Sequence, residues 1–72
     1  MKDFDLHAAK MGAEVCTREG GYAKITTFDN GSITCPITAI YDLYGYENKT
    51  VFRKNGRFRS DGKKSRCDLM LK

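Results

Sequence analysis

Short stretches rich in Val, Ile, Thr, Tyr and Phe alternate along this chain with glycine-containing turns. β-Branched and aromatic residues favour strands, whereas Asn-Gly and Asp-Gly favour positive φ angles and signal hairpins. The turn signals at 20–21, 30–31, 45, 55–56 and 61–62 therefore divide the chain into short strands. The predicted strands are Glu14–Arg18, Tyr22–Asp29, Ile33–Asp42, Lys49–Lys54, Arg57–Ser60 and Cys67–Leu71.

The third predicted strand shows the clearest alternation between apolar and polar positions. Its apolar face carries Ile33, Cys35, Ile37, Ala39 and Tyr41. Side chains alternate between the two faces of a strand, so these five are expected to face the core. Pro36 cannot donate a ladder hydrogen bond, which predicts an edge strand or a bulge at that residue. Ile40 falls on the other face, where it indicates a bulge or a second small apolar cluster.

The N-terminal segment predicts a short helix over Leu6 to Met11. Asp5 is a good N-cap residue, and Gly12 tolerates the left-handed conformation that ends many helices. Fewer than two helical turns are not stable alone in water, so the helix must lie against the sheet. We therefore expect one domain over residues 1–72. It is a mainly β fold, either a small SH3-like barrel or a curled meander of five to six short strands, with this helix covering one open end.

Composition is consistent with a small globular protein. The chain has 72 residues, and its hydrophobic content of 40% is too high for a disordered tail. No apolar run approaches the roughly 20 residues of a membrane span, and the first residues lack the apolar stretch of a signal peptide. We expect a soluble, cytoplasmic protein with no membrane contact.

The positive charge is concentrated in the last third of the chain. The net charge is +4, but residues 1–48 carry four cations against seven acids. Residues 49–72 carry nine cations, and their only acids are Asp61 and Asp68. A basic segment of this kind favours an anionic partner, such as nucleic acid or a nucleotide.

Residues for catalysis, metal binding or cofactor binding are scarce. His7 is the only histidine, so a base beside a nucleophile is not evident. Gly20-Gly21 leads into a predicted strand, whereas a phosphate-binding loop would lead into a helix. Three cysteines and His7 are an alternative zinc ligand set, but they lack the close pairing of typical zinc ligands. We expect no enzyme activity, no metal and no cofactor.

The segment from Val51 to Arg59 surrounds one Asn-Gly turn and has two alternative registers. With a two-residue turn, Arg53 would face Phe58 and point towards the core, which is costly for an unpaired charge. With a three-residue loop of 54–56, Arg53 pairs with Arg57 and Phe52 pairs with Phe58. We predict the second register, with both phenyl rings in the core.

In that register, Arg53, Arg57 and Arg59 share the outer face of the hairpin. Arginine offers forked donors that match phosphate or carboxylate, so this face is a candidate anion-binding strip. We expect nearby cations to extend the strip: Lys54, Lys63, Lys64 and Arg66. The alternative interpretation is a solvated face whose arginine stems cover apolar surface.

Tyr44 and Tyr46 flank Gly45 in a predicted loop and are candidate aromatic contacts. Their rings would stack on a base or bind a protein, which gives a second hypothesis. In that hypothesis the chain is a protein–protein interaction module, such as a viral inhibitor of a host protein. A small β domain with an open edge strand is also able to form a homo-oligomer through that edge.

Caps, turns and strand positions along most of the chain carry a resemblance to known proteins: Phe4-Asp5-Leu6, Ala9, Gly12, Val15, Thr17-Arg18, Gly20, Ala23-Lys24-Ile25, Pro36-Ile37, Asn55-Gly56-Arg57-Phe58, Ser60-Asp61-Gly62 and Asp68-Leu69. In these residues the chain resembles short uncharacterised proteins of gut Bacteroidetes and of their phages and mobile elements. The resemblance implies a phage or prophage context and transfers no activity. Such a context favours small proteins that inhibit or sequester host defence components, nucleotide signals included.

Overall fold

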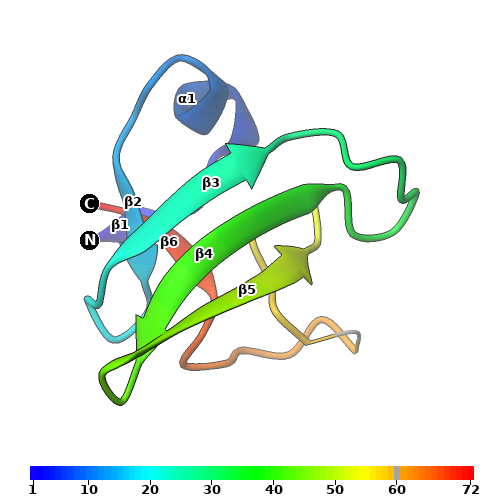
Figure 1. The fold of residues 1–72 in the computed structure, drawn as a ribbon. Coiled ribbons are helices and arrows are strands. Elements are labelled where there is room, and N and C mark those ends of the chain that lie inside the picture. Colours follow the sequence, from blue (N-terminus) through cyan, green and yellow to red (C-terminus); the bar gives the residue numbers. More distant parts are fainter. Residues whose placement is uncertain (60) are drawn as a thin grey trace.

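The computed structural model describes residues 1–59 and 61–72, and these residues form six short strands and one short helix (Figure 1). The elements in chain order are β1 Lys2–Asp3, α1 Leu6–Lys10, β2 Val15–Thr17, β3 Ala23–Thr27, β4 Ile37–Leu43, β5 Tyr46–Phe52 and β6 Leu69–Leu71. The prediction of a mainly β fold with one N-terminal helix is confirmed. No helix in the described residues is long and apolar enough to cross a membrane.

The strands form two antiparallel sheets of three strands each. One sheet has the order β1-β6-β2, and the other has the order β3-β4-β5. A single bridge between Cys16 and Tyr22 connects the end of β2 to the start of β3. The described strands do not close into a barrel, so the curled meander is the form of the prediction that holds.

The short helix follows its predicted boundaries closely. The carboxylate of Asp5 accepts hydrogen bonds from the N–H groups of His7 and Ala8, at 3.0 and 3.3 Å. Gly12 follows the helix with a φ of 102°, in the left-handed region that glycine adopts easily. Ala9 is buried, and the half-buried Leu6 packs against the core. Tertiary packing thus supports a helix that is too short to be stable alone.

The alternation predicted for the third strand holds from Ile37 onward. Ile37, Ala39 and Tyr41 are buried on one face of β4, which is the central strand of its sheet. Pro36 directly precedes β4, where its missing N–H costs no ladder bond. The predicted start at Ile33 is wrong, because residues 31–36 form a loop and Ile33 is 91% exposed. The prediction that Pro36 marks an edge strand or a bulge is also wrong, since the register shift lies in β3.

The core lies between the two sheets and is built around Phe52, Ile37 and Leu69, which are fully buried. The ring of Tyr41 meets that of Phe52 edge to face, with centroids 5.9 Å apart. Aromatic pairs at such distances contribute about 0.5–1.5 kcal/mol beyond area burial. The rings of Phe52 and Phe58 are 6.0 Å apart, but the prediction that both lie in the core is wrong for Phe58, which is 37% exposed.

Three other strand predictions differ from the structure. The strand predicted over Lys49–Lys54 is β5, which begins earlier, at Tyr46, and ends at Phe52. Residues 57–59 of the predicted strand Arg57–Ser60 are not in a strand, and Ser60 lies outside the described residues. The last strand begins at Leu69 and not at Cys67, because the N–H of Asp68 bonds to the carbonyl of Ser65 in a turn. The two-residue strand β1 was not predicted. It pairs with β6, so the first and last strands lie side by side (Figure 1).

Candidate functional site

The candidate site begins at the hairpin tip that follows β5. The N–H of Arg53 donates to the carbonyl of Arg57 at 3.0 Å, and the N–H of Gly56 donates to the carbonyl of Arg53 at 2.8 Å. Gly56 has a φ of 83°, and the carboxamide of Asn55 accepts from the N–H of Arg57. This is the predicted three-residue loop, in which glycine occupies the left-handed position.

Beyond Arg57 the two arms of the hairpin separate, because β6 and the turn before it replace the expected ladder. The N–H of Phe58 donates to Oδ1 of Asp68 at 2.8 Å. The N–H of Leu69 donates to the carbonyl of Gly56 at 2.9 Å. These two bonds attach the hairpin tip to the C-terminal strand, and they explain why residues 57–59 form no strand with β5.

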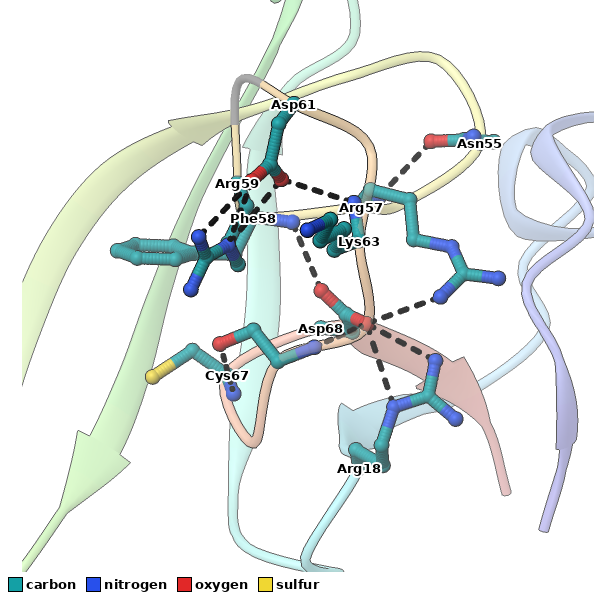
Figure 2. A network of polar contacts seen from close by, with 10 residues as sticks. Arg18, Asn55, Arg57, Phe58, Arg59, Asp61, Lys63, Cys67 and Asp68 are labelled. Carbon is teal, nitrogen blue, oxygen red and sulfur yellow. Dashed lines mark hydrogen bonds and ion pairs between the residues drawn. The ribbon is translucent and has the colours of Figure 1, made fainter.

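Asp68 is the centre of a buried polar network (Figure 2). Only 1% of its surface is exposed, and its Oδ2 accepts from Nε and Nη2 of Arg18 at 3.2 and 2.9 Å. The same oxygen accepts from the N–H of Ser65 at 2.9 Å and from Nη1 of Arg57 at 3.5 Å. A buried carboxylate is tolerated only when it is paired and hydrogen-bonded, and this network meets that requirement.

The surroundings of Asp68 act on its pKa in opposite directions. Burial raises the pKa, since it penalises the charged form. Hydrogen bonds from the backbone N–H groups of Phe58 and Ser65, together with the Arg18 guanidinium, stabilise the carboxylate and outweigh burial. The pKa of Asp68 therefore lies below its ordinary value, and the group is ionised at neutral pH.

The network around Asp68 carries excess positive charge. Two guanidinium groups, from Arg18 and Arg57, face this one carboxylate. Asp68 engages only Nη1 of Arg57, and in Figure 2 the Nη2 atom of Arg57 is turned away from the carboxylate. Arg18, Asn55 and Arg57 line a surface hollow whose wall also includes Asp3. This hollow therefore offers donor groups that suit an anion, although the carboxylates of Asp3 and Asp68 balance the two guanidinium charges within it.

Arg59 and Asp61 form a second, exposed ion pair in the loop after the hairpin. Nε and Nη2 of Arg59 donate to the Asp61 carboxylate at 3.1 and 2.8 Å (Figure 2). The N–H of Lys63 also donates to Asp61, at 2.9 Å. The hydrogen bonds from Arg59 and Lys63 lower the pKa of Asp61.

The predicted arginines lie near one another in sequence but line three different hollows. Arg53 lies beside Lys54 and Asn55, Arg57 lies beside Arg18, and Arg59 lies beside Phe58 and Asp61. Arg53 and Arg57 are half-buried, while Arg59 and the predicted lysines Lys54, Lys63 and Lys64 are exposed. Anion binding by these six residues stays a prediction.

Of the two predicted aromatic contacts, Tyr44 lies in the two-residue turn between β4 and β5. Tyr46, predicted in the same loop, is instead the first residue of β5 and pairs with Leu43. Tyr44 and Tyr46 are 69% and 74% exposed. Tyr44 has a φ of 54° and Gly45 a φ of 80°, so the two form a tight hairpin turn with positive φ at both central residues. The Arg66 guanidinium covers the Tyr44 ring at 4.8 Å from its centroid and also pairs with Glu19. A non-glycine residue in this conformation is uncommon and costs backbone energy.

The cysteines are unpaired thiols in different surroundings. Cys16 and Cys67 are buried, and Cys35 is half-buried. Within residues 1–59 and 61–72, no group of three or more His, Cys, Asp and Glu side chains is arranged to hold a metal ion. Buried in β2, Cys16 packs as a small hydrophobic residue.

Sequence reasoning missed Arg18 and Asp68, the two residues that form the strongest ion pair of the network. Arg18 is 50 residues from Asp68, so no local pattern links them. One signal was present, since Asp68 is the only charged residue in the segment from Cys67 to Leu71. An acid inside a predicted apolar strand must find a cationic partner if it is buried.

Comparison with known proteins places the chain beside a phage protein family. The family model described as Haemophilus phage HP1 protein YO09 matches residues 1–70. No curated protein and no solved structure matches the chain. The match confirms the resemblance to phage proteins.

Proposed function

The chain belongs to the family of Haemophilus phage HP1 protein YO09, and on that premise we propose that it is a small non-catalytic module that binds nucleic acid through a basic surface. The basic surface consists of the cations of the hairpin tip and the following loop: Arg53, Lys54, Arg57, Arg59, Lys63 and Lys64. The observation that carries the proposal is the shared carboxylate of Asp68. One buried acid faces two guanidinium groups and leaves positive charge beside it.

The charge balance supports this choice of surface. Together with Arg18, the basic surface contains seven cations, and the carboxylates bonded to it are Asp61 and Asp68. The rest of the chain carries a net charge of −1, so the whole positive charge of the protein belongs to this region. A patch of one sign attracts an anionic partner and accelerates its association.

The ion pairs of the basic surface, Arg57–Asp68 and Arg59–Asp61, differ in how easily a phosphate would replace the carboxylate. Asp68 holds Arg57 from the buried side, so we expect Arg57 to stay in place and offer its remaining donors. Arg59 and Asp61 are both exposed, and exposed ion pairs contribute little to stability. A phosphate would therefore release Arg59 from Asp61 at little cost.

The spread of the cations favours a nucleic-acid backbone over a single nucleotide. Arg53, Arg57 and Arg59 line three different hollows, and Lys63 and Lys64 lie further along the loop. A polymer presents phosphates at intervals, so it can meet several separated cations at once. One nucleotide would reach only a part of them.

The test is fluorescence anisotropy with labelled single- and double-stranded oligonucleotides at several salt concentrations. We expect binding at low salt that weakens steeply as salt is added, because phosphate contacts release counterions. Absence of binding to both oligonucleotides at low salt would refute the proposal. A thermal shift with a cyclic dinucleotide in that situation would favour nucleotide sequestration instead.

A matched pair of variants would locate the contact. Replacing Lys54, Lys63 and Lys64 by Gln removes three exposed charges without touching the Asp68 network. We expect this variant to bind more weakly, with a salt slope reduced by about one for each lysine that contacts a phosphate. The control replaces Lys2, Lys10 and Lys24, which are equally exposed but lie in β1, α1 and β3. Equal losses in the two variants would mean that binding is not located at the basic surface.

Tyr44 supports a second candidate function, contact with a host protein. A tyrosine in the left-handed region is strained, and strain of this kind is often retained at functional positions. With Tyr46 it offers two exposed rings at one turn, and tyrosine is frequent at protein interfaces. This hypothesis predicts that Tyr44→Ala or Tyr46→Ala abolishes capture of the partner while Tyr22→Ala, a control on another exposed tyrosine, does not.

We also infer a cytoplasmic location in a gut Bacteroidetes host. A nucleic-acid ligand would be met in the cytoplasm, and the cap and turn residues resemble short proteins of those bacteria and of their phages. Fractionation of infected cells with a tagged chain would test the location.

A further inference from the structure

β5 has an open edge. It pairs with β4 along its whole length, and no strand lies on its other side in the described part of the chain. In Figure 1, β5 forms the outer border of its sheet. Such an edge presents unpaired N–H and C=O groups, which are a template for another strand.

The pairing with β4 decides which backbone groups face this edge. Leu43 and Tyr46 close the two-residue turn, so they form a hydrogen-bonded pair. The backbone groups of Tyr46, Asn48 and Thr50 therefore point to β4, and those of Glu47, Lys49 and Val51 point to the open edge. The bond from the N–H of Arg53 to Arg57 lies on the side away from β4, which agrees with this assignment.

The sequence of β5 is complementary to itself in one antiparallel register. When Asn48 lies opposite Asn48 of a second copy, Glu47 lies opposite Lys49 of that copy, and Lys49 opposite its Glu47. Both pairs use backbone groups that face the open edge, so each exchanges two N–H···O bonds. Glu47 and Lys49 are exposed and lie on the same face of the sheet, so opposite charges meet across the strands.

We propose that two copies of this chain associate through β5 in this register, with a two-fold axis at Asn48. The β3-β4-β5 sheets of the two copies then form one continuous sheet of the order β3-β4-β5-β5-β4-β3. On the face towards the core, the exposed ring of Tyr46 lies opposite Thr50 of the second copy, a favourable aromatic–β-branched pair. Moving the two-fold axis from Asn48 to Lys49, a register change of two residues, would place Lys49 opposite Lys49, and like charges in that position are unfavourable.

A charge swap tests the interface by sedimentation equilibrium from low micromolar to near-millimolar concentrations. Lys49→Glu and Glu47→Lys each create two like-charge pairs, and we expect each to raise the dimer dissociation constant at least about tenfold. The double variant Glu47→Lys, Lys49→Glu restores opposite charges and should return the constant to within a few-fold of the original. Lys24→Glu is the control, because it makes the same charge change on the same outer face but in β3.

Amide hydrogen exchange gives a second test of the dimer that needs no substitution. The N–H groups of Glu47 and Lys49 should become protected as the protein concentration rises, whereas that of Asn48, bonded to β4, should be protected at every concentration. A chain that remains monomeric over the whole range overturns the proposal, as does a dimer that both single variants leave unchanged. Neither outcome bears on anion binding, since no residue of the basic surface takes part in the interface.

Discussion

Asp68 and Asp61 each accept hydrogen bonds from an arginine and from the backbone, yet they hold together very different parts of the molecule. Asp68 is buried, and its partners include Arg18, which lies 50 residues away, and Phe58, which lies 10 residues away. Asp61 is exposed, and its partners Arg59 and Lys63 are each two residues away. The same chemical group therefore fixes tertiary structure in one place and only a local turn in the other. In the binding proposed above, a phosphate would displace Asp61 from Arg59, whereas Arg57 would keep its bond to Asp68.

Replacing each carboxylate in turn should show the largest difference in stability between the two sites. Asp68→Ala leaves two arginines facing a site without a carboxylate and two buried N–H groups without their acceptor, which should destabilise the fold by about 3–5 kcal/mol. That is a large share of the roughly 4–10 kcal/mol expected for a domain of 72 residues. Urea unfolding followed by circular dichroism measures the loss.

Asp61→Ala is the control for this prediction. Its partners are exposed and local, so we expect almost no change in the urea midpoint. Comparable losses for the two variants would show that the buried network has no special structural role.

Two glycines show the same contrast between a packed position and an open one. Gly56 and Gly62 both have positive φ, at 83° and 77°. A Cβ on Gly56 would lie 2.7 Å from Cγ of Phe4 and 3.0 Å from the carbonyl oxygen of Leu69, whereas a Cβ on Gly62 would meet nothing within 4 Å. Gly62→Ala should therefore cost only backbone strain, about 1 kcal/mol, and Gly56→Ala at least about 2 kcal/mol because the packing against β6 is also disturbed. Thermal unfolding of both variants gives the difference, and equal shifts would contradict the packing seen at Gly56.

The two arginines bonded to Asp68 should contribute unequally to stability. Arg18 makes two hydrogen bonds at 3.2 and 2.9 Å, and Arg57 makes one at 3.5 Å. Arg18→Met should cost about 1.5–3 kcal/mol, since hydrogen bonds to charged groups are in that range, and Arg57→Met should cost less. Urea denaturation of the two variants, with Arg59→Met as an exposed control, checks the order. A larger loss for Arg57→Met would reverse the assignment of the main partner.

Lowering the pH should reveal the different structural roles of the two carboxylates. Both have a lowered pKa, so the stability that each contributes is fully present above the ordinary Asp value near 4 and is lost as the pH falls through the lower native value. We expect protonation of Asp68 to coincide with unfolding, and protonation of Asp61 to leave the fold intact. Carboxyl chemical shifts followed by NMR from neutral to low pH, beside the circular dichroism signal, measure both. Protonation of Asp68 in a chain that stays folded would contradict the structural role of its network.

Local signals predicted the fold well wherever a feature depends on neighbouring residues. The cap at Asp5, the alternation through Ile37, Ala39 and Tyr41, and the glycine position in the 53–57 loop all follow from local backbone preferences. The start of the third strand was missed at Ile33, because Ile33, Thr34 and Cys35 in the loop before Pro36 continue the alternation of the strand.

The candidate site was predicted less completely, because its central contact is not local. The hairpin arms separate at Phe58 since the Asp68 carboxylate competes for its N–H, and the sequence of the hairpin alone contains no sign of that competitor. Arg57 was predicted as a freely exposed cation, and its bond to Asp68 depends on the same long-range contact. Only the isolated acid in an apolar segment pointed to a buried ion pair.

The place of β6 in its sheet has a consequence for how the chain folds during synthesis. β6 is the last described element to leave the ribosome, yet it is the central strand between β1 and β2 and follows directly on Asp68. Until it emerges, β1 and β2 lack their strand partner, while the β3-β4-β5 meander already has all its own. Contacts between distant parts of a chain form slowly, so we expect the nascent protein to hold a formed meander and an unpaired N-terminal segment. The emergence of Asp68 and β6 then completes both the second sheet and the anchor of the hairpin in one step.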